Sequence, residues 1–416
     1  MNIRLFFSAL LFLFVQQVIK SYVEEAGTMP ILFEEPRQPS DWMSYLPFGV
    51  SVGILILSLA GLCWGGLRYS YSRLLQTIIY TYGALTLSIA VLTAVPNLHY
   101  IAEGLTVFWQ MAGASFFLSL QVLFWGLLVH TCSFRQAGAS FPLLALGALF
   151  SSIASFQLLM FMSPTWWSLT LWMVLLGLAA NMLIRSSEKG DVCPRSSSMD
   201  ATPWKTFILP VVAVSLGATL TSPLLRPIWM AVLNTQYPET NAVVIYMAHF
   251  QLLQLLGWLL CGLALIILSV ALYRKQVEAW RLTVYALLIG VLCLGSGFLS
   301  QCWLSMGEEA YAASLGKGLE IFSKSLAEPL IQILAYVALT GLAAQWRFTA
   351  LITVQFLAFW LLPQLVRGMT NSIWSLYNSE ANPDFVYVLL LYSSLLFLLL
   401  MISALVATHR ISSKIS

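Results

Sequence analysis

The sequence predicts an all-α integral membrane protein whose twelve transmembrane helices form two halves of six. Three observations indicate this fold class. First, the 416 residues are 59% hydrophobic and only 9% charged, whereas soluble domains are nearer half apolar and about a quarter charged. Second, the apolar residues gather in twelve stretches, most of them close to the roughly 20 residues that cross a bilayer. Third, one polar stretch, residues 185–204, divides these stretches six and six.

The first half, residues 1–184, contains six predicted spans. The first apolar run, Leu5 to Ile19, is compatible with a signal peptide or with an uncleaved span. No small-x-small cleavage site follows this run, so we favour the uncleaved span. The second span contains Gly61 and Gly65, a GxxxG pattern that favours close helix packing within the bundle. The five later spans are predicted at residues 46–67, 74–95, 105–132, 140–162 and 165–184.

A linker and a second half follow. Residues 185–204 contain a serine run, a proline and several charges, a composition typical of a loop. The second half covers residues 205–416. Its six spans are predicted at residues 206–225, 243–273, 280–300, 316–342, 348–366 and 386–408.

The charges indicate the orientation of the chain. When the spans alternate from a cytoplasmic N-terminus, most of the 20 basic residues and few of the 17 acidic residues lie in cytoplasmic segments. This agrees with the positive-inside rule and places both termini in the cytoplasm. We therefore expect a multi-pass protein of the inner, cytoplasmic membrane. The net charge of +3 is too small to indicate a nucleic-acid partner, so we expect the lipid bilayer and a small solute as partners.

Twelve spans in two halves are typical of a major-facilitator-like bundle. Such secondary transporters bind their substrate near mid-membrane, between the halves. The chain contains no HExxH, GxSxG or GxxxxGK[ST] motif, so neither a hydrolase nor an ATP-driven pump is indicated. Its six cysteines are scattered and form no CxxC pair. We therefore predict no metal and no cofactor, and we expect a monomer.

A stripe of four charges lies in the predicted span at 316–342. Lys317, Glu320, Lys324 and Glu328 are three or four residues apart, so they share one helix face. Ionisable groups at membrane depth are costly and usually face a cavity or a partner. The alternative is that the helix begins later and that these residues lie at the outer headgroup level. We favour the interpretation as a substrate-binding wall, because the apolar residues that follow are too few to span.

Four segments resemble, in order, parts of the bacterial and plastidic ATP/ADP translocases. The main similarity is a tryptophan, an aromatic-proline pair and an aromatic-Met-x-x-Phe run, here Trp229, Tyr237-Pro238 and Tyr246 to Phe250. These residues lie within the segment 224–250. The other three segments are 46–48, 119–126 and 322–336.

The resemblance implies a twelve-span carrier that exchanges ATP for ADP or imports other nucleotides. In that family four charged positions are associated with transport. Lys20 matches the lysine after the first span. The two glutamate positions fall on Gly113 and Arg226, and the eleventh span contains no lysine. At most one of the four charges is therefore kept, which favours a divergent member.

We therefore expect a carrier for a small anionic substrate, with ATP or ADP as the leading candidates. The cations of the predicted site would attract phosphate groups, and its two acids would keep the empty site neutral. The alternative is a non-transporting scaffold with the same fold. The predicted substrate-binding residues are Lys20, Arg226, Lys317, Glu320, Lys324 and Glu328.

Overall fold

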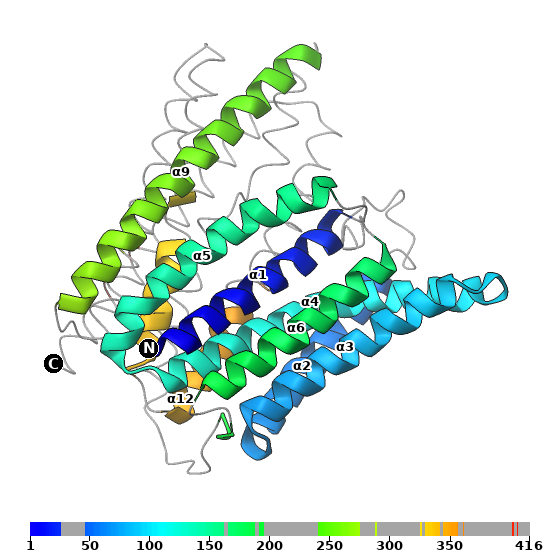
Figure 1. Cartoon of the computed structure of the whole chain (residues 1–416), viewed down its shortest axis with the longest axis horizontal. Coiled ribbons are helices and arrows are strands. Elements are labelled where there is room, and N and C mark those ends of the chain that lie inside the picture. The colour runs from blue at the N-terminus through cyan, green and yellow to red at the C-terminus, as the bar shows by residue number, and fades with distance from the viewer. Residues whose placement is uncertain are drawn as a thin grey trace. The chain divides into compact units, whose positions relative to one another are not determined.

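The computed structural model describes the chain as a set of helices (Figure 1). The described residues are 1–25, 46–161, 165–187, 191–194, 240–274, 325–326, 329–341 and 344–356, with single positions at 288, 361, 402 and 406. The helices within them are α1 Ile3–Glu25, α2 Leu46–Arg68, α3 Tyr71–Thr93, the 3₁₀-helix η2 Pro96–Leu98, α4 His99–Thr131, α5 Phe134–Phe161, α6 Trp166–Ser186, α9 Thr240–Arg274 and α12 Ala344–Phe356.

The membrane prediction is confirmed at the level of the fold class. Six helices in the described part of the chain are long and apolar enough to cross a bilayer. The six spans predicted for residues 1–184 correspond to α1 through α6, and the span at 243–273 corresponds to α9. Most of the 185–204 linker lies outside the described residues, as do nearly all of the spans predicted at 206–225, 280–300 and 386–408. The number twelve therefore stays a prediction.

Local chemistry fixes where two of these helices begin. The hydroxyl oxygen of Ser70 accepts a hydrogen bond from the Arg73 backbone amide and caps α3. Thr165 and Ser168 form a reciprocal capping box at the start of α6. Because the first amides of a helix have no partner within it, such caps stabilise the helix by about 1 kcal/mol.

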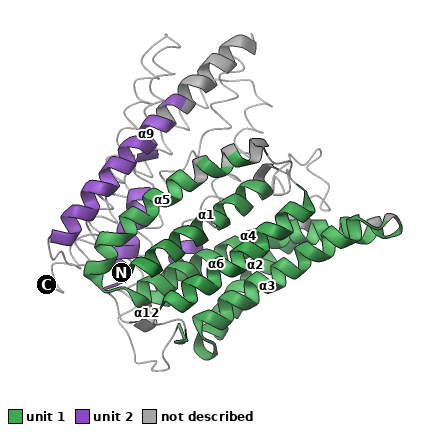
Figure 2. Ribbon diagram, viewed as in Figure 1, with its two compact units in different colours: residues 1–199, 342–352 green, residues 200–341, 353–416 purple. Residues whose placement is uncertain are grey.

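The chain divides into two compact units (Figure 2). The first unit is Met1–Met199 with Leu342–Ile352, and it contains α1 through α6 and the first part of α12. The second unit is Asp200–Gly341 with Thr353–Ser416. In the second unit, the fully buried Tyr336 hydroxyl accepts hydrogen bonds from Gln332 and Gln355.

The helices of the first unit pack as two sets of three. Helix α1 packs on α5 and α6 (Figure 1), and we call these three the α1 set. Helix α4 packs on α2 and α3 in the same way, and these form the α4 set. Helices α3 and α6 join the two sets. Exchanging α1 with α4, α2 with α5 and α3 with α6 maps the contacts of one set onto those of the other and the α3–α6 contact onto itself. This is the pattern of a three-plus-three repeat.

The α1 set is closely packed. A Cβ atom added at Gly147 of α5 would overlap the Leu10 side chain of α1, so the glycine permits the close approach of these two helices. Hydroxyl pairs join α1 to its neighbours, with 3.1 Å between the Oγ atoms of Ser8 and Ser186 and 3.0 Å between those of Ser21 and Ser155. In an apolar surrounding such paired hydroxyls satisfy each other.

An aromatic cluster connects the α4 set. Tyr82 of α3 stacks between Trp109 and Phe116 of α4, with ring centroids 5.2 Å and 4.0 Å away. The Tyr82 hydroxyl donates to the Trp109 carbonyl at 3.1 Å, and the Trp109 indole donates to Thr86 at 2.9 Å. All of these polar atoms are therefore satisfied inside the bundle, as buried polar groups require. The Trp166 ring of α6 closes the cluster edge-on to Trp109 at 5.3 Å.

The first part of α12 also belongs to the first unit. The Phe348 ring packs edge-on to Tyr71 of α3, and a Cβ at Gly66 of α2 would meet this phenyl ring at 2.7 Å. The Arg347 guanidinium donates to the Val129 carbonyl near the end of α4 at 3.3 Å. This segment is therefore held against the ends of α2, α3 and α4.

Candidate functional site

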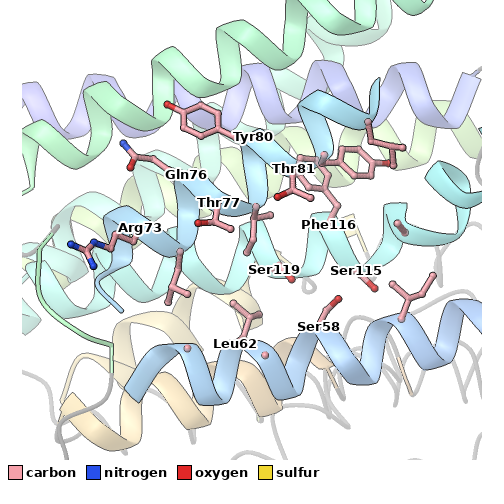
Figure 3. A pocket seen from close by; sticks show the side chains of 18 of the residues that line it. Ser58, Leu62, Arg73, Gln76, Thr77, Tyr80, Thr81, Ser115, Phe116 and Ser119 are labelled. Carbon is pink, nitrogen blue, oxygen red and sulfur yellow. The ribbon is translucent and has the colours of Figure 1, made fainter. Parts of the chain in front are cut away.

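A cavity of about 950 Å³ lies in the first unit between α2, α3 and α4 (Figure 3). We call it the α4 groove. Its volume is at the upper end of the range of about 300–1,000 Å³ that is usual for ligand pockets. It is lined by Ile54, Ser58, Gly61, Leu62, Trp64, Gly65, Tyr69, Arg73, Leu74, Gln76, Thr77, Ile78, Tyr80, Thr81, Tyr82, Leu85, Phe108, Ala112, Ser115, Phe116 and Ser119.

The groove exists because α2 and α3 both pack on α4 but diverge from each other. They approach closely near their connecting turn, where an added Cβ at Gly65 would lie 2.9 Å from Leu74. One turn earlier on α2, a Cβ at Gly61 would meet nothing within 4 Å. The two glycines of the GxxxG pattern therefore differ in role: Gly65 permits helix packing as predicted, whereas Gly61 lines open space.

Hydroxyl groups run along the largely apolar walls. Thr77 and Thr81 are four residues apart on α3, and Ser115 and Ser119 are four residues apart on α4, so each pair faces one direction. Ser58 of α2 lies opposite the two serines of α4 (Figure 3). The groove therefore offers hydrogen bonds along a surface that is otherwise apolar.

Ser115 at the floor of the groove is 4% exposed, and no hydrogen bond reaches its hydroxyl from the residues that the structure describes. Hydroxyls in apolar helices usually bond to a carbonyl one turn earlier. Thr86 does so to Tyr82, and Thr106 does so to Ala102, both at 2.8 Å. Ser115 does not, so its covered hydroxyl is a buried polar group without a hydrogen bond from the described residues.

Cations and aromatic rings mark the end of the groove near the α2–α3 turn. Arg73 lines the groove in the first turn of α3 and is exposed (Figure 3). The Arg68 guanidinium lies 4.5 Å from the centroid of the Trp64 ring, a cation–π contact. The Tyr69 ring lies edge-on to Trp64 at 6.2 Å. Tryptophan and tyrosine at the end of a span are typical of the interface between membrane and water.

The structure places one of the six predicted site residues, Lys20. The sequence prediction ended the first apolar run at Ile19 and matched Lys20 to a lysine after the span. The helix continues past this run, because α1 ends at Glu25 and Lys20 is a half-buried residue within it. The helix continues because no glycine or proline occurs before Gly27. The other five, Arg226, Lys317, Glu320, Lys324 and Glu328, lie outside the described residues.

Gly113 is the residue that the resemblance to the ATP/ADP translocases matches to a glutamate position. It is buried in α4, and an added Cβ would lie 3.4 Å from the Tyr82 hydroxyl. The stacked Tyr82 ring therefore occupies the side of α4 on which a longer side chain at residue 113 would begin.

Sequence reasoning missed the α4 groove. The available signal was the spacing of four between hydroxyl residues on two neighbouring spans, Thr77 with Thr81 and Ser115 with Ser119. Among the described residues, no three His, Cys, Asp or Glu side chains come together to hold a metal ion.

Comparison with known proteins shows the fold but not a family. No family model matches the chain, and no curated protein matches it. The resemblance to ATP/ADP translocases therefore stays an expectation.

Solved structures match along nearly the whole chain. A bacterial homologue of the iron transporter ferroportin, in an outward-facing state, aligns with a TM-score of 0.67 at 15% identity over 99% of this chain and 98% of that one. The major facilitator transporter FucP aligns with a TM-score of 0.59 at 12% identity over 97% and 98% of the two chains. A double-tryptophan mutant of XylE aligns with a TM-score of 0.59 at 13% identity over 98% and 94%. This chain is therefore an all-helical membrane protein with a fold like that of major facilitator transporters.

Proposed function

We propose that the protein is a secondary transporter that moves a small solute across the membrane by alternating access. The observation that carries this proposal is the match along nearly the full length of both chains to transporters of this fold. In such folds the two halves rock around a site near mid-membrane and expose it to each side in turn.

The packing of the first unit supports a half that moves as one body. The Gly147–Leu10 contact holds α1 closely against α5, and the Trp109–Trp166 contact joins α4 to α6. Packed interiors deform little and transmit movement, because their side chains leave few voids. A rocking mechanism requires such a rigid half.

For the substrate we propose a small phosphorylated anion, with ATP and ADP as the first candidates. The support is the set of charges predicted for the site, in which Lys20, Arg226, Lys317 and Lys324 outnumber two glutamates. Lysine and arginine bind phosphate strongly where water is largely excluded. Glu320 and Glu328 balance Lys317 and Lys324 when the site is empty.

Uptake of labelled solutes by intact cells that express the chain tests the proposal. ATP, ADP, other nucleotides and inorganic phosphate are offered separately, and membrane insertion is measured in parallel. We expect saturable uptake of at least one phosphorylated solute. Lys20→Ala and Lys324→Ala should each reduce this uptake at unchanged expression. Lys189→Ala, in the predicted linker, is the control with the same chemical change.

The possible results separate the parts of the proposal. Uptake of a neutral or cationic solute, but of no phosphate compound, would overturn the proposed substrate class. The proposal that the protein is a transporter would still stand. Failure to move any solute across a broad panel, with insertion proven, would overturn transport and favour a scaffold of this fold. Equal loss in all three lysine variants would overturn the assigned roles of Lys20 and Lys324.

A further inference from the structure

We propose that the α4 groove binds one anionic phospholipid, with its phosphate at Arg68 and Arg73 and its acyl chains along α2, α3 and α4. The proposal is independent of the transported substrate, because the groove lies within the first unit. It rests on the depth of the groove, the charge at one end of it and the character of its walls.

The groove has the depth of one membrane leaflet. Along α3 its lining residues run from Arg73 to Leu85, which is about 18 Å at 1.5 Å per residue. Half of a hydrocarbon core of about 30 Å is about 15 Å. A molecule whose headgroup lies at Arg73 would therefore extend its chains roughly to mid-membrane, as a phospholipid of one leaflet does.

The charge at the headgroup end complements an anion. Arg68 is the last residue of α2, Arg73 lies in the first turn of α3, and both are exposed. No aspartate or glutamate is among the residues that line the groove. Trp64 and Tyr69 lie at the same end, which fits the headgroup level of a bilayer. The positive-inside expectation assigns this end to the cytoplasmic leaflet, where anionic lipids attract basic residues at the membrane surface.

The apolar walls of the groove suit acyl chains, and the side chains at its outer edges, which we call the rims, are exposed. Trp64, Tyr80 and Phe108 on the three helices are each about half exposed, at 52%, 55% and 48%. Gly61 leaves room between the rims, because a Cβ there would meet nothing within 4 Å. A lipid can therefore enter sideways from the bilayer. A soluble ligand would have to cross the same apolar rims.

Ser115 distinguishes a lipid from a polar solute. It lies next to Phe116, which stacks on Tyr82, nine residues and about 14 Å beyond Arg73 along α3. At that depth a phospholipid has only hydrocarbon, so its binding does not use the free hydroxyl. A polar solute bound on the floor of the groove would use it.

Native mass spectrometry of the purified full-length protein tests the proposal. The delipidated protein is equilibrated with mixed micelles that contain equal amounts of phosphatidylglycerol and phosphatidylcholine. We expect one retained phosphatidylglycerol and little phosphatidylcholine. Arg68→Gln with Arg73→Gln should weaken phosphatidylglycerol binding about 25-fold, since each surface arginine contributes about five-fold. Arg274→Gln, at the exposed end of α9, is the control with the same loss of charge.

Blocking the groove provides a second, independent arm. Gly61→Leu fills the open space and should abolish retention of phosphatidylglycerol. Gly53→Leu, on the same helix, also meets nothing within 4 Å but does not line the groove, so binding should be unchanged. Equal retention of phosphatidylglycerol and phosphatidylcholine by the unmodified protein would overturn the proposal. Equal retention of phosphatidylglycerol by the Gly61→Leu and Gly53→Leu variants would also overturn it. Loss of phosphatidylglycerol in Ser115→Ala would overturn the placement of the headgroup at Arg68 and Arg73, because it would require a polar group of the lipid at the floor of the groove.

Discussion

The two three-helix sets of the first unit share one contact pattern but differ in how the space beside the central helix is filled. In the α1 set, α5 lies so close to α1 that residue 147 has room only for glycine beside Leu10. In the α4 set, α2 and α3 diverge, and a cavity of about 950 Å³ remains beside α4. The arrangement of the helices is therefore the same, and the side chains decide how much space remains beside α1 and beside α4.

The polar groups of the two sets find their partners in different ways. In the α1 set, serine hydroxyls pair across helices, as Ser8 does with Ser186 and Ser21 with Ser155. In the α4 set, the aromatic cluster satisfies its own polar atoms, whereas the Ser115 hydroxyl on the groove floor has no hydrogen bond from the described residues. Buried polar atoms without a hydrogen bond from the described residues therefore occur in both sets, at Gln16, Tyr22 and Trp172 in the α1 set and at Ser115 in the α4 set.

The largest effect should come from removing the aromatic cluster on which the α4 set depends. Trp109→Ala deletes the ring that stacks on Tyr82 and contacts Trp166, and it leaves Thr86 without its indole donor. Removing a buried tryptophan side chain costs about 3–5 kcal/mol of unfolding free energy. We expect a large fall in the thermal stability of the purified protein, measured by loss of helical signal on heating in detergent.

Trp109→Phe separates the ring from its hydrogen bond. It keeps an aromatic face for Tyr82 but loses the indole donor to Thr86, so the fall in stability should be clearly smaller. If Trp109→Ala and the unmodified protein lost helical signal at the same temperature, α4 would be held to α3 by other contacts, and the difference between the sets would disappear.

The next effect concerns the close contact in the α1 set. Gly147→Ala places a methyl group against the Cδ2 end of Leu10, which has to turn away, so stability should fall by less than the roughly 1–3 kcal/mol of overpacking against rigid neighbours. Leu10→Ala in the same chain removes the obstacle and should restore most of the lost stability. Gly61→Ala in the α4 set introduces the same methyl group into open space and should not destabilise the protein. Equal losses for Gly147→Ala and Gly61→Ala would contradict the difference in packing.

The helices could be predicted from the sequence because a span of about 20 apolar residues is a local property. Their ends were placed within several residues, as at α2, predicted from 46 to 67 and observed from Leu46 to Arg68. The first helix is longer than its apolar run, because hydropathy ends a run at the first charge, here Lys20, whereas the hydrogen-bonded backbone of α1 continues to Glu25.

The α4 groove could not be predicted, because it depends on which faces of three helices meet. Gly61 and Gly65 look equivalent in the sequence and both line the groove, yet an added Cβ would meet Leu74 at Gly65 and nothing within 4 Å at Gly61. The rotation and tilt of each helix come from packing and not from composition. The charges at 317–328, the strongest signal in the sequence, lie outside the residues that would test them.

A smaller effect should distinguish the hydroxyls of the two sets. Ser115→Ala removes a buried hydroxyl that has no described hydrogen bond, so it should raise stability by about 1 kcal/mol in delipidated protein. Ser151→Ala in α5 removes a hydroxyl that donates to the Gly147 carbonyl at 2.7 Å, so it should lower stability or leave it unchanged. The two melting temperatures are compared in one detergent. A fall for Ser115→Ala would show that its hydroxyl already has a partner within the protein.

The smallest effect, one on reactivity alone, concerns Cys132, where α4 ends beside the start of α1. The thiol is 4% exposed, and it borders a separate cavity of about 500 Å³ together with Arg4 of α1 and Arg185 of α6. Burial raises the pKa of the Cys132 thiol to about 11, although the positive N-terminal amine acts in the opposite direction. At pH 7 only about one thiol in 10⁴ is then the reactive thiolate.

A variant that keeps Cys132 as its only cysteine should therefore react slowly with iodoacetamide at pH 7. The rate should rise about ten-fold for each pH unit until the pH approaches 11. Because the pKa in the folded protein exceeds that of an unfolded thiol, this group stabilises the fold below about pH 8.5 and ceases to do so as the pH rises toward 11. A matched variant that keeps only the half-buried Cys193 should react faster at pH 7. Equal reaction rates for the two variants would mean that Cys132, between the end of α4 and the start of α1, is open to solvent. The close packing of the α1 set would then not extend to the end of α4.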